Sequence, residues 1–382
     1  MTGIDIQKIL ELAPSPAYVL DLSRLRHNLA ILDQVQQRSG AKILLALKAF
    51  AMWHLFPLIR QTLQGVCASS PWEAQLGREK FGGEVHSFAA AFKTADVKQL
   101  LNVSNHLVFN SFAQLEKFRP LWQGRGVSVG LRVNPEHSDG QTEIYDPCAQ
   151  NSRLGIRRKA FDGQSLQGVE GLHFHTLCEH LFEPLERTAR VFEEKFGEFL
   201  PQMKWLNLGG GHHITRQGYD LDGLVELVGH FRDKYNLELY LEPGEAAVIG
   251  SGILVGEVLD IVPNPITSAI LDVSATCHMP DILEMPYRPE IVGGSDFGVQ
   301  SHGYRLGGPS CLAGDVIGDW SFEQPLCPGD RLAFLDMAHY TMVKTTTFNG
   351  IQHPHLCVWE PETGSLEVVR SFDYEDFRSR LS

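Results

Sequence analysis

The chain has 382 residues, of which 43% are hydrophobic and 21% are charged, as is usual for a folded globular protein. Its apolar runs all fall short of the roughly 18 residues that a membrane-spanning helix needs, so we expect no membrane partner. With 33 Lys and Arg against 46 Asp and Glu, the net charge is −13, which disfavours nucleic acid as a partner. This charge either serves solubility alone or attracts a cationic substrate.

From about residue 40 to 245, short apolar runs alternate with amphipathic segments such as 181–198 and 219–235. The predicted strands are 43–48, 65–69, 85–89, 106–110, 128–134, 171–176, 205–211 and 239–244. Their continuous apolar character is typical of parallel strands that are covered by helices. Eight strand-then-helix units predict an α/β fold with a (β/α)8, TIM-like barrel rather than an open, doubly wound sheet.

After about residue 250, short strand-like runs are separated by Gly and Pro turns and show little helical periodicity. These runs are 253–262, 267–272, 331–335, 355–360 and 366–370. They predict a mostly antiparallel β domain over 251–382, after a barrel over 22–250. The strand-like segment 17–21 suggests that residues 1–21 join the β domain.

The cysteines indicate a reducing environment. Seven are scattered along the chain without a CxxC pair, so we expect neither a disulfide framework nor a structural zinc site. The first residues, MTGIDIQKILELAPSPAY, lack a basic region followed by an apolar core. We therefore expect a cytoplasmic protein.

Polar residues follow the predicted strands at the end where barrel enzymes carry their active groups. Lys48 ends the first barrel strand between apolar stretches, where desolvation would lower its pKa and free the amine for Schiff-base chemistry, unless the ammonium reaches the surface. Gly209, Gly210 and Gly211 form either a phosphate-binding loop or a tight turn after the seventh strand. Glu242 ends the eighth strand, where it could hold a protonated pyridine nitrogen or form an ordinary salt bridge.

The segment HFHTLCEH, residues 173–180, contains four potential metal ligands, but their spacing matches no zinc pattern. We therefore expect no metal, and instead expect the imidazole of His175 to stack on a flat cofactor. In the β domain, Cys311 lies in the loop GGPSCLAGD and is either a reactive thiol or an ordinary buried cysteine. Tyr340 could hydrogen-bond a phosphate or could simply pack in the core.

Together these motifs resemble the fold-type III pyridoxal-phosphate decarboxylases, the ornithine/diaminopimelate superfamily with an alanine racemase-like fold, over residues 17–375. The resemblance implies pyridoxal 5′-phosphate as the cofactor, with Lys48 as its aldimine lysine. It further implies contacts to the cofactor from His175, Gly209, Gly210, Gly211, Glu242 and Tyr340. Arg153, in a loop that resembles one near the cofactor in this family, joins this set.

The segment GPSCLAGD resembles the family signature GPxCxxxD, with Cys311 and Asp315 supplied by the second subunit of a homodimer whose active site lies at the interface. Cys311 is then the candidate proton donor to the carbanion. HFHTLCE, EPGEA and LDVSATCHMPDILEMPYRP resemble the branch that decarboxylates carboxynorspermidine or carboxyspermidine, which are cationic carboxylated triamines.

The family usually carries Arg at the position of Glu245, and the acidic residue suits a substrate with several ammonium groups. Asp315, Asp281 and Glu284 are further candidates for binding its distal amines. Decarboxylation of diaminopimelate or another diamino acid, and a non-catalytic regulatory homologue, remain alternatives.

Overall fold

The computed structural model describes residues 5–140 and 143–382. The chain divides into two compact units, one comprising Asn28–Ala247 and the other comprising Met1–His27 together with Val248–Ser382. The chain crosses between the units inside two helices, α2 (Leu22–Ser39) and α9 (Glu245–Val248).

The Asn28–Ala247 unit is a closed barrel of eight parallel strands, in the order β2-β3-β4-β5-β6-β8-β9-β10, with β10 pairing back to β2. The strands are β2 (Lys42–Ala46), β3 (Gly65–Ala68), β4 (Glu84–Phe88), β5 (His106–Phe109), β6 (Ser128–Asn134), β8 (Gly171–His173), β9 (Trp205–Asn207) and β10 (Glu238–Leu241). A short strand, β7 (Ile156–Arg157), pairs with β6 outside the ring. The predicted (β/α)8 barrel is therefore confirmed.

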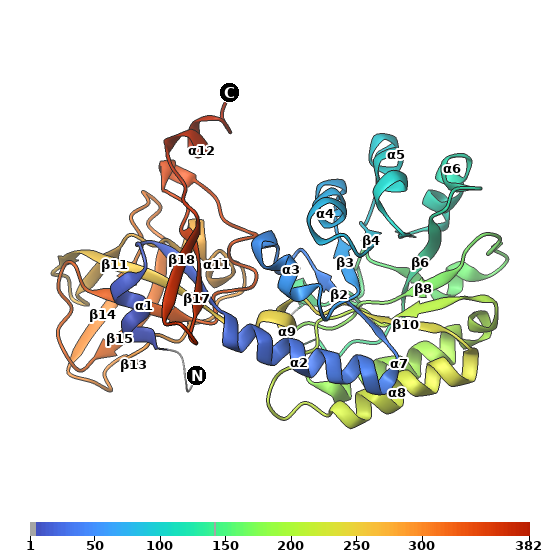
Figure 1. Ribbon diagram of the computed structural model, residues 1–382, viewed down its shortest axis with the longest axis horizontal. Coiled ribbons are helices and arrows are strands. Elements are labelled where there is room, and N and C mark those ends of the chain that lie inside the picture. The colour runs from blue at the N-terminus through green and yellow to red at the C-terminus, as the bar shows by residue number, and fades with distance from the viewer. Residues whose placement is uncertain (1–4, 141–142) are drawn as a thin grey trace. The chain divides into compact units, whose positions relative to one another are not determined.

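Helices lie on the outside of the barrel strands, as Figure 1 shows for those beside β3, β4 and β6. Besides α2 they are α3 (Phe56–Ile59), α4 (Pro71–Leu76), α5 (Thr94–Val103), α6 (Phe112–Trp122), α7 (Phe182–Phe196) and α8 (Leu221–Tyr235). Helix α7 buries Leu185, Ala189, Phe192 and Phe196, three or four residues apart, so that one apolar stripe packs inward. Asp220 caps the start of α8 by accepting the Gly223 N–H, and Asn236 ends α8 in the left-handed conformation.

Because side chains alternate along a strand, every second residue of each barrel strand points into the barrel. In β4 these are Glu84, His86 and Phe88. The inward side chains are unusually polar for a packed interior: His86 and His173 are both buried there.

The second unit is built on one mixed sheet, in the order β13-β15-β14-β12-β11-β1-β17-β18, with β16 paired to β11. Its strands are β1 (Ala17–Asp21), β11 (Gly252–Val262), β12 (Ser268–Leu271), β13 (Gly294–Asp296), β14 (His302–Gly307), β15 (Val316–Phe322), β16 (Arg331–Leu335), β17 (His355–Glu360) and β18 (Ser365–Arg370). Its short helices are α1 (Ile6–Leu12), α10 (Ala275–His278), α11 (Asp281–Glu284) and α12 (Tyr374–Arg378).

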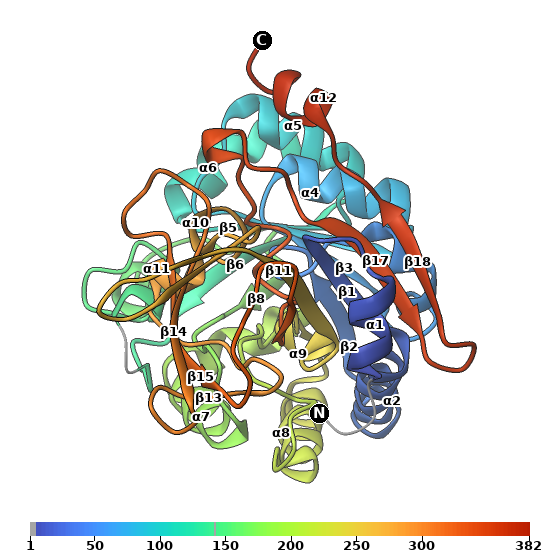
Figure 2. The same cartoon turned by 90° about the vertical axis from the view of Figure 1, so that its left-hand side faces the viewer.

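Most pairings in this sheet are antiparallel, as predicted, but β1–β17 and β12–β14 are parallel. The predicted strand 17–21 is β1, which is buried at every position between β11 and β17 (Figure 2). Across the described parts of the chain, no helix combines the length and the apolar character that crossing a membrane requires.

Candidate active site

Lys48 lies in the turn that follows β2, because the strand ends at Ala46, two residues earlier than predicted. Solvent reaches the side chain, but the surrounding barrel excludes much of the water. This desolvation lowers the pKa of the Lys48 ammonium, and the positive charge of Arg132 adds to the effect, while Cys67 and Glu242 oppose it. A lysine with a lowered pKa is a better nucleophile near neutral pH.

Glu242 follows β10, the barrel neighbour of β2, and its side chain is only 13% exposed. Asn207 donates its Nδ2–H to Oε1 at 2.7 Å, and Nε2 of His173 lies 3.3 Å from Oε2. Burial alone would raise the pKa of Glu242, but His173, His86 and Asn207 together lower it to about 2. The carboxylate is therefore ionised at neutral pH.

The glycine run leaves the sheet after β9 and passes very close to other backbone segments. Gly209 and Gly211 have φ angles of 73° and 82°, in the left-handed region that favours glycine. A Cβ on Gly210 would lie 2.1 Å from the carbonyl oxygen of Glu242. The Gly209 N–H donates to Oδ1 of Asn207, whereas no acceptor among the described residues contacts the Gly211 N–H.

His175 follows β8 and accepts the Gly210 N–H on Nδ1 at 3.0 Å. Arg132, inside β6, donates from Nη2 to the His175 carbonyl at 2.8 Å and lies over the ring of Phe88. Burial, together with the positive charges of Lys48 and Arg132, holds the pKa of His175 well below its usual value. His175 therefore presents a neutral ring that is oriented by the Gly210 N–H, while Arg132 holds its backbone carbonyl.

Glu245 and Arg153, two other predicted site residues of the barrel unit, contact protein groups outside the predicted site. Glu245 begins α9, and its Oε1 lies 3.0 Å from Nε2 of His213. Arg153 lies on an exposed loop, where its carbonyl accepts the side-chain N–H of Asn110 at 2.8 Å. Contacts of Glu245 with substrate and of Arg153 with cofactor stay predictions.

Cys311 is exposed, and its backbone N–H donates to Oδ1 of Asn349. Asp315 is buried in the same loop, where its carboxylate accepts the Ser274 hydroxyl at 2.8 and 3.0 Å as well as two backbone N–H groups. The Asp315 carboxylate thus anchors the loop that carries Cys311. A direct contact of Asp315 with substrate remains a prediction.

The other predicted acidic residues of this unit share one cation. Nζ of Lys344 lies 2.6 Å from Glu284 and also hydrogen-bonds Asp281. Tyr340 has a φ of 50°, which is uncommon for a residue other than glycine and fixes the direction of the chain at this position. Lys344 therefore already pairs with both carboxylates, and contacts of Asp281 and Glu284 with substrate stay predictions.

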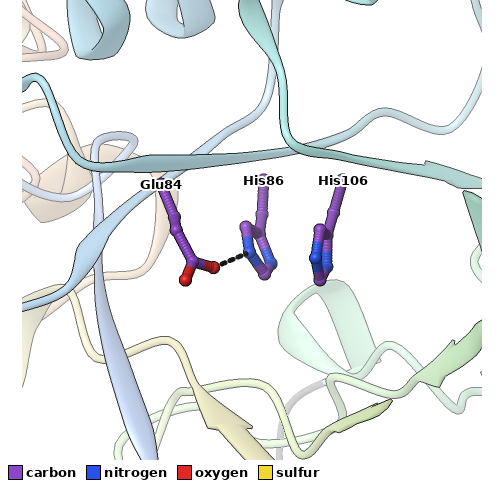
Figure 3. Close-up of side chains that lie close together, drawn as sticks. All are labelled: Glu84, His86 and His106. Atoms are coloured by element: carbon purple, nitrogen blue, oxygen red, sulfur yellow. Dashed lines mark hydrogen bonds and ion pairs between the residues drawn. The ribbon is translucent and has the colours of Figure 1, made fainter. Parts of the chain in front are cut away.

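At the opposite, amino-terminal end of the barrel strands, Glu84, His86 and His106 point in the same direction (Figure 3), and their ligating atoms lie within 4.8 Å of one another. A pocket of about 460 Å³ opens beside Glu84 and His106. Two contacts argue against a metal ion, because both oxygens of Glu84 already have partners: Nζ of Lys42 lies 2.6 Å from Oε1, and Nε2 of His86 lies 3.1 Å from Oε2. Glu84, His86 and Lys42 form an ion network, and the ring of His106 stacks on that of His86.

The sequence interpretation missed Arg132 and Asn207, which contact predicted site groups, and it considered His173 only as a potential metal ligand. One signal was present, since the HFH pattern places His173 on the same face of its strand as His175. Nothing in the sequence pairs His173 or Asn207 with Glu242, because that contact forms only when the barrel closes.

Comparisons with known proteins identify the family of the chain. The family model "Pyridoxal-dependent decarboxylase, C-terminal sheet domain" matches residues 17–338. The chain is 47% identical to the carboxyaminopropylagmatine decarboxylase of Synechocystis sp., covering 96% of this chain and 95% of that protein. It is 44% identical to the carboxynorspermidine/carboxyspermidine decarboxylase of Campylobacter jejuni, covering 96% and 98%.

Among solved structures, carboxynorspermidine decarboxylase from Campylobacter jejuni, complexed with norspermidine, superposes with a TM-score of 0.89 at 43% identity. The match covers 96% of this chain and 99% of that one. Diaminopimelate decarboxylase from Helicobacter pylori, complexed with L-lysine, shares the fold with a TM-score of 0.83 at 19% identity, covering 98% and 99%. The chain therefore belongs to the family of pyridoxal-dependent decarboxylases, as a carboxy-lyase of fold type III.

Proposed function

We propose that the protein binds pyridoxal phosphate through Lys48 and decarboxylates carboxynorspermidine or carboxyspermidine, releasing norspermidine or spermidine and carbon dioxide. The observation that carries the proposal is a pair of groups on neighbouring barrel strands. Lys48, with its lowered pKa, follows β2, and the ionised Glu242 follows β10.

The residues at this end of the barrel fit pyridoxal phosphate. The glycine run has no space for side chains, and no acceptor in the described segments 5–140 and 143–382 contacts the Gly211 N–H, which suits a phosphate. His175 offers a neutral flat ring, and Glu242 offers a negative charge for a protonated ring nitrogen. When bound, the cofactor supplies the electron sink that accepts the electrons of the broken carbon–carboxylate bond.

The residues of the chain then have distinct roles. Lys48 would supply the amine to which the cofactor binds. The ionised Glu242 would hold the protonated ring nitrogen, and the neutral imidazole of His175 would help to hold the cofactor ring. Cys311, whose thiol is exposed on a loop anchored by hydrogen bonds, would give a proton to the substrate carbon after carbon dioxide leaves. We propose that Cys311 acts in the active site of the second subunit of a homodimer.

The substrate class rests on the relatives. Two curated relatives, at 44% and 37% identity, are carboxynorspermidine/carboxyspermidine decarboxylases, and the net charge of −13 suits a polycationic substrate. One observation favours a second candidate: the relative at 47% identity is a carboxyaminopropylagmatine decarboxylase. An agmatine arm ends in a planar guanidinium, whereas the triamines end in an ammonium group.

Carbon dioxide release tests the proposal. The purified protein with pyridoxal phosphate is incubated separately with carboxynorspermidine, carboxyspermidine, carboxyaminopropylagmatine and diaminopimelate. We expect the highest kcat/KM with one of the two carboxylated triamines. A preference for carboxyaminopropylagmatine would establish the second candidate, and release from diaminopimelate alone would overturn the substrate class. Cofactor binding without release from any substrate would indicate a non-catalytic homologue.

A further inference from the structure

Inside the barrel, a buried imidazole lies beside the carboxylate of Glu242. His173 ends β8 and is 2% exposed, and its Nε2 lies 3.3 Å from Oε2 of Glu242. On the other side, Asn207 donates to Oε1. Each oxygen of Glu242 therefore has one neighbour from the barrel interior and retains a lone pair for another donor.

Charged and titratable groups face Glu242 from several strands: Lys48 after β2, His86 on β4, Arg132 on β6 and His173 on β8. Arg132, which is always protonated, directs its guanidinium towards groups other than Glu242. The guanidinium of Arg132 donates to the His175 carbonyl and lies 4.6 Å over the ring of Phe88.

The two direct neighbours of Glu242 are neutral. Asn207 is an amide, and burial, reinforced by Arg132 and His86, lowers the pKa of His173 although Glu242 itself opposes the shift. A neutral donor orients a carboxylate without cancelling its charge, whereas an arginine or lysine at this position would compete with a cationic ligand. The charge of Glu242 is thus preserved for a group at the barrel mouth.

The ring nitrogens of His173 also lack hydrogen-bond partners among the described residues. Within the described part of the chain, neither ring nitrogen of His173 makes an aligned hydrogen bond, and buried polar atoms without partners are uncommon. Oε2 of Glu242 is close enough that a small rotation of the imidazole converts the 3.3 Å approach into a hydrogen bond.

We propose that His173 is a positioning residue that donates its Nε2–H to Glu242 and thereby fixes that carboxylate for the ring nitrogen of the cofactor. The inference rests on the proposed function, because it requires pyridoxal phosphate at this site. It extends that function to a residue that acts through Glu242. His173 would make the site prefer a cofactor with a basic ring nitrogen, without itself contacting the cofactor or the substrate.

The test compares two ligands and two variants. The ligands are pyridoxal phosphate and its 1-deaza analogue, in which a C–H group replaces the ring nitrogen. The variants are His173→Leu, which removes the donor, and His173→Gln, whose amide N–H reaches the position of Nε2. Dissociation constants for the cofactor-free proteins are measured by tryptophan fluorescence quenching.

We expect His173→Leu to weaken pyridoxal phosphate binding about three- to tenfold, the range of one ordinary hydrogen bond, and to leave binding of the deaza analogue unchanged. His173→Gln should restore most of the difference. In a Glu242→Gln background, His173→Leu should have no further effect, because the residue acts through Glu242.

Equal weakening of both ligands would show a merely structural role and would overturn the inference, as would unchanged binding of both. If His173→Leu lacks a cooperative thermal transition, His173→Met, a more adaptable apolar residue, replaces it. Different results contradict the proposed function and the role of His173. A wild-type protein that binds no pyridoxal phosphate contradicts the proposed function, whereas a wild type that binds it no better than His173→Leu contradicts only the role of His173.

Discussion

Gly210 is a position of the glycine run at which a single methyl group should clash with backbone that carries a predicted site residue. Its backbone lies between Glu242 and His175, and a Cβ there would sit 2.1 Å from the carbonyl oxygen of Glu242 and 2.8 Å from its carbonyl carbon. A carbon–oxygen contact needs about 3.3 Å, so one of the two segments must move by roughly 1.2 Å. The atoms that clash are backbone atoms, which no rotamer change can remove.

Gly210→Ala should therefore lower the free energy of unfolding by about 1–3 kcal/mol, the usual cost of overpacking. It should also lower kcat/KM by on the order of 100-fold, since a displacement of about 1 Å in a positioned group has an effect of that size. Urea unfolding measures the first consequence and carbon dioxide release the second, and a cofactor titration shows whether cofactor affinity falls with them.

Gly229→Ala is the matched control. Gly229 lies inside α8, and a Cβ there would meet nothing within 4 Å. The same substitution should stabilise this helix by about 0.5–1 kcal/mol and leave turnover unchanged. Wild-type stability and cofactor affinity in Gly210→Ala would refute the argument, because they would show that the glycine run is not tightly packed against Glu242.

Two further predictions concern a carboxylate and a thiol. Burial raises the pKa of Glu84, but His86 and Lys42 outweigh it and lower that pKa to about 2. The stabilisation is therefore complete above the unfolded pKa of about 4.3 and is lost as the pH falls towards 2. Glu84→Gln should lower the free energy of unfolding by about 1–3 kcal/mol at neutral pH. In urea titrations, the difference in unfolding free energy between wild type and variant should narrow from about pH 4.5 to about pH 3. A difference that does not change with pH would contradict this assignment. Cys311→Ala should reduce kcat for carbon dioxide release at least about tenfold and should retain cofactor affinity. Cys327 is also exposed, and Cys327→Ala should leave kcat unchanged. Equal activity of the two variants would remove Cys311 from the mechanism.

The barrel could be predicted because each of its strands is a short apolar run that needs no knowledge of its neighbours. Lys48 and Glu242 could be placed at the same end of the barrel because parallel strands bring their carboxyl ends together. Several predicted strands were too long, since 205–211 includes glycines with positive φ that cannot continue a strand, and β9 ends at Asn207.

The missed features depend on contacts between distant parts of the chain. Strands β13, β14 and β15 contain glycine and charged residues, such as Arg305 and Asp319, which pair across the sheet, so no apolar run marks them. The parallel pairing of β1 with β17 joins segments more than 330 residues apart. Likewise, the contact of Lys344 with Asp281 spans 63 residues and is invisible to local pattern.

The central claim is that Lys48 holds the cofactor, and chemical trapping tests it directly. The wild-type protein is mixed with pyridoxal phosphate, reduced with sodium borohydride, digested and analysed by mass spectrometry, with Lys48→Ala treated in parallel. We predict a single pyridoxyl-modified peptide containing Lys48, and no stoichiometric adduct in the variant. Stoichiometric modification of a different lysine, or an adduct that persists in Lys48→Ala, would contradict the account.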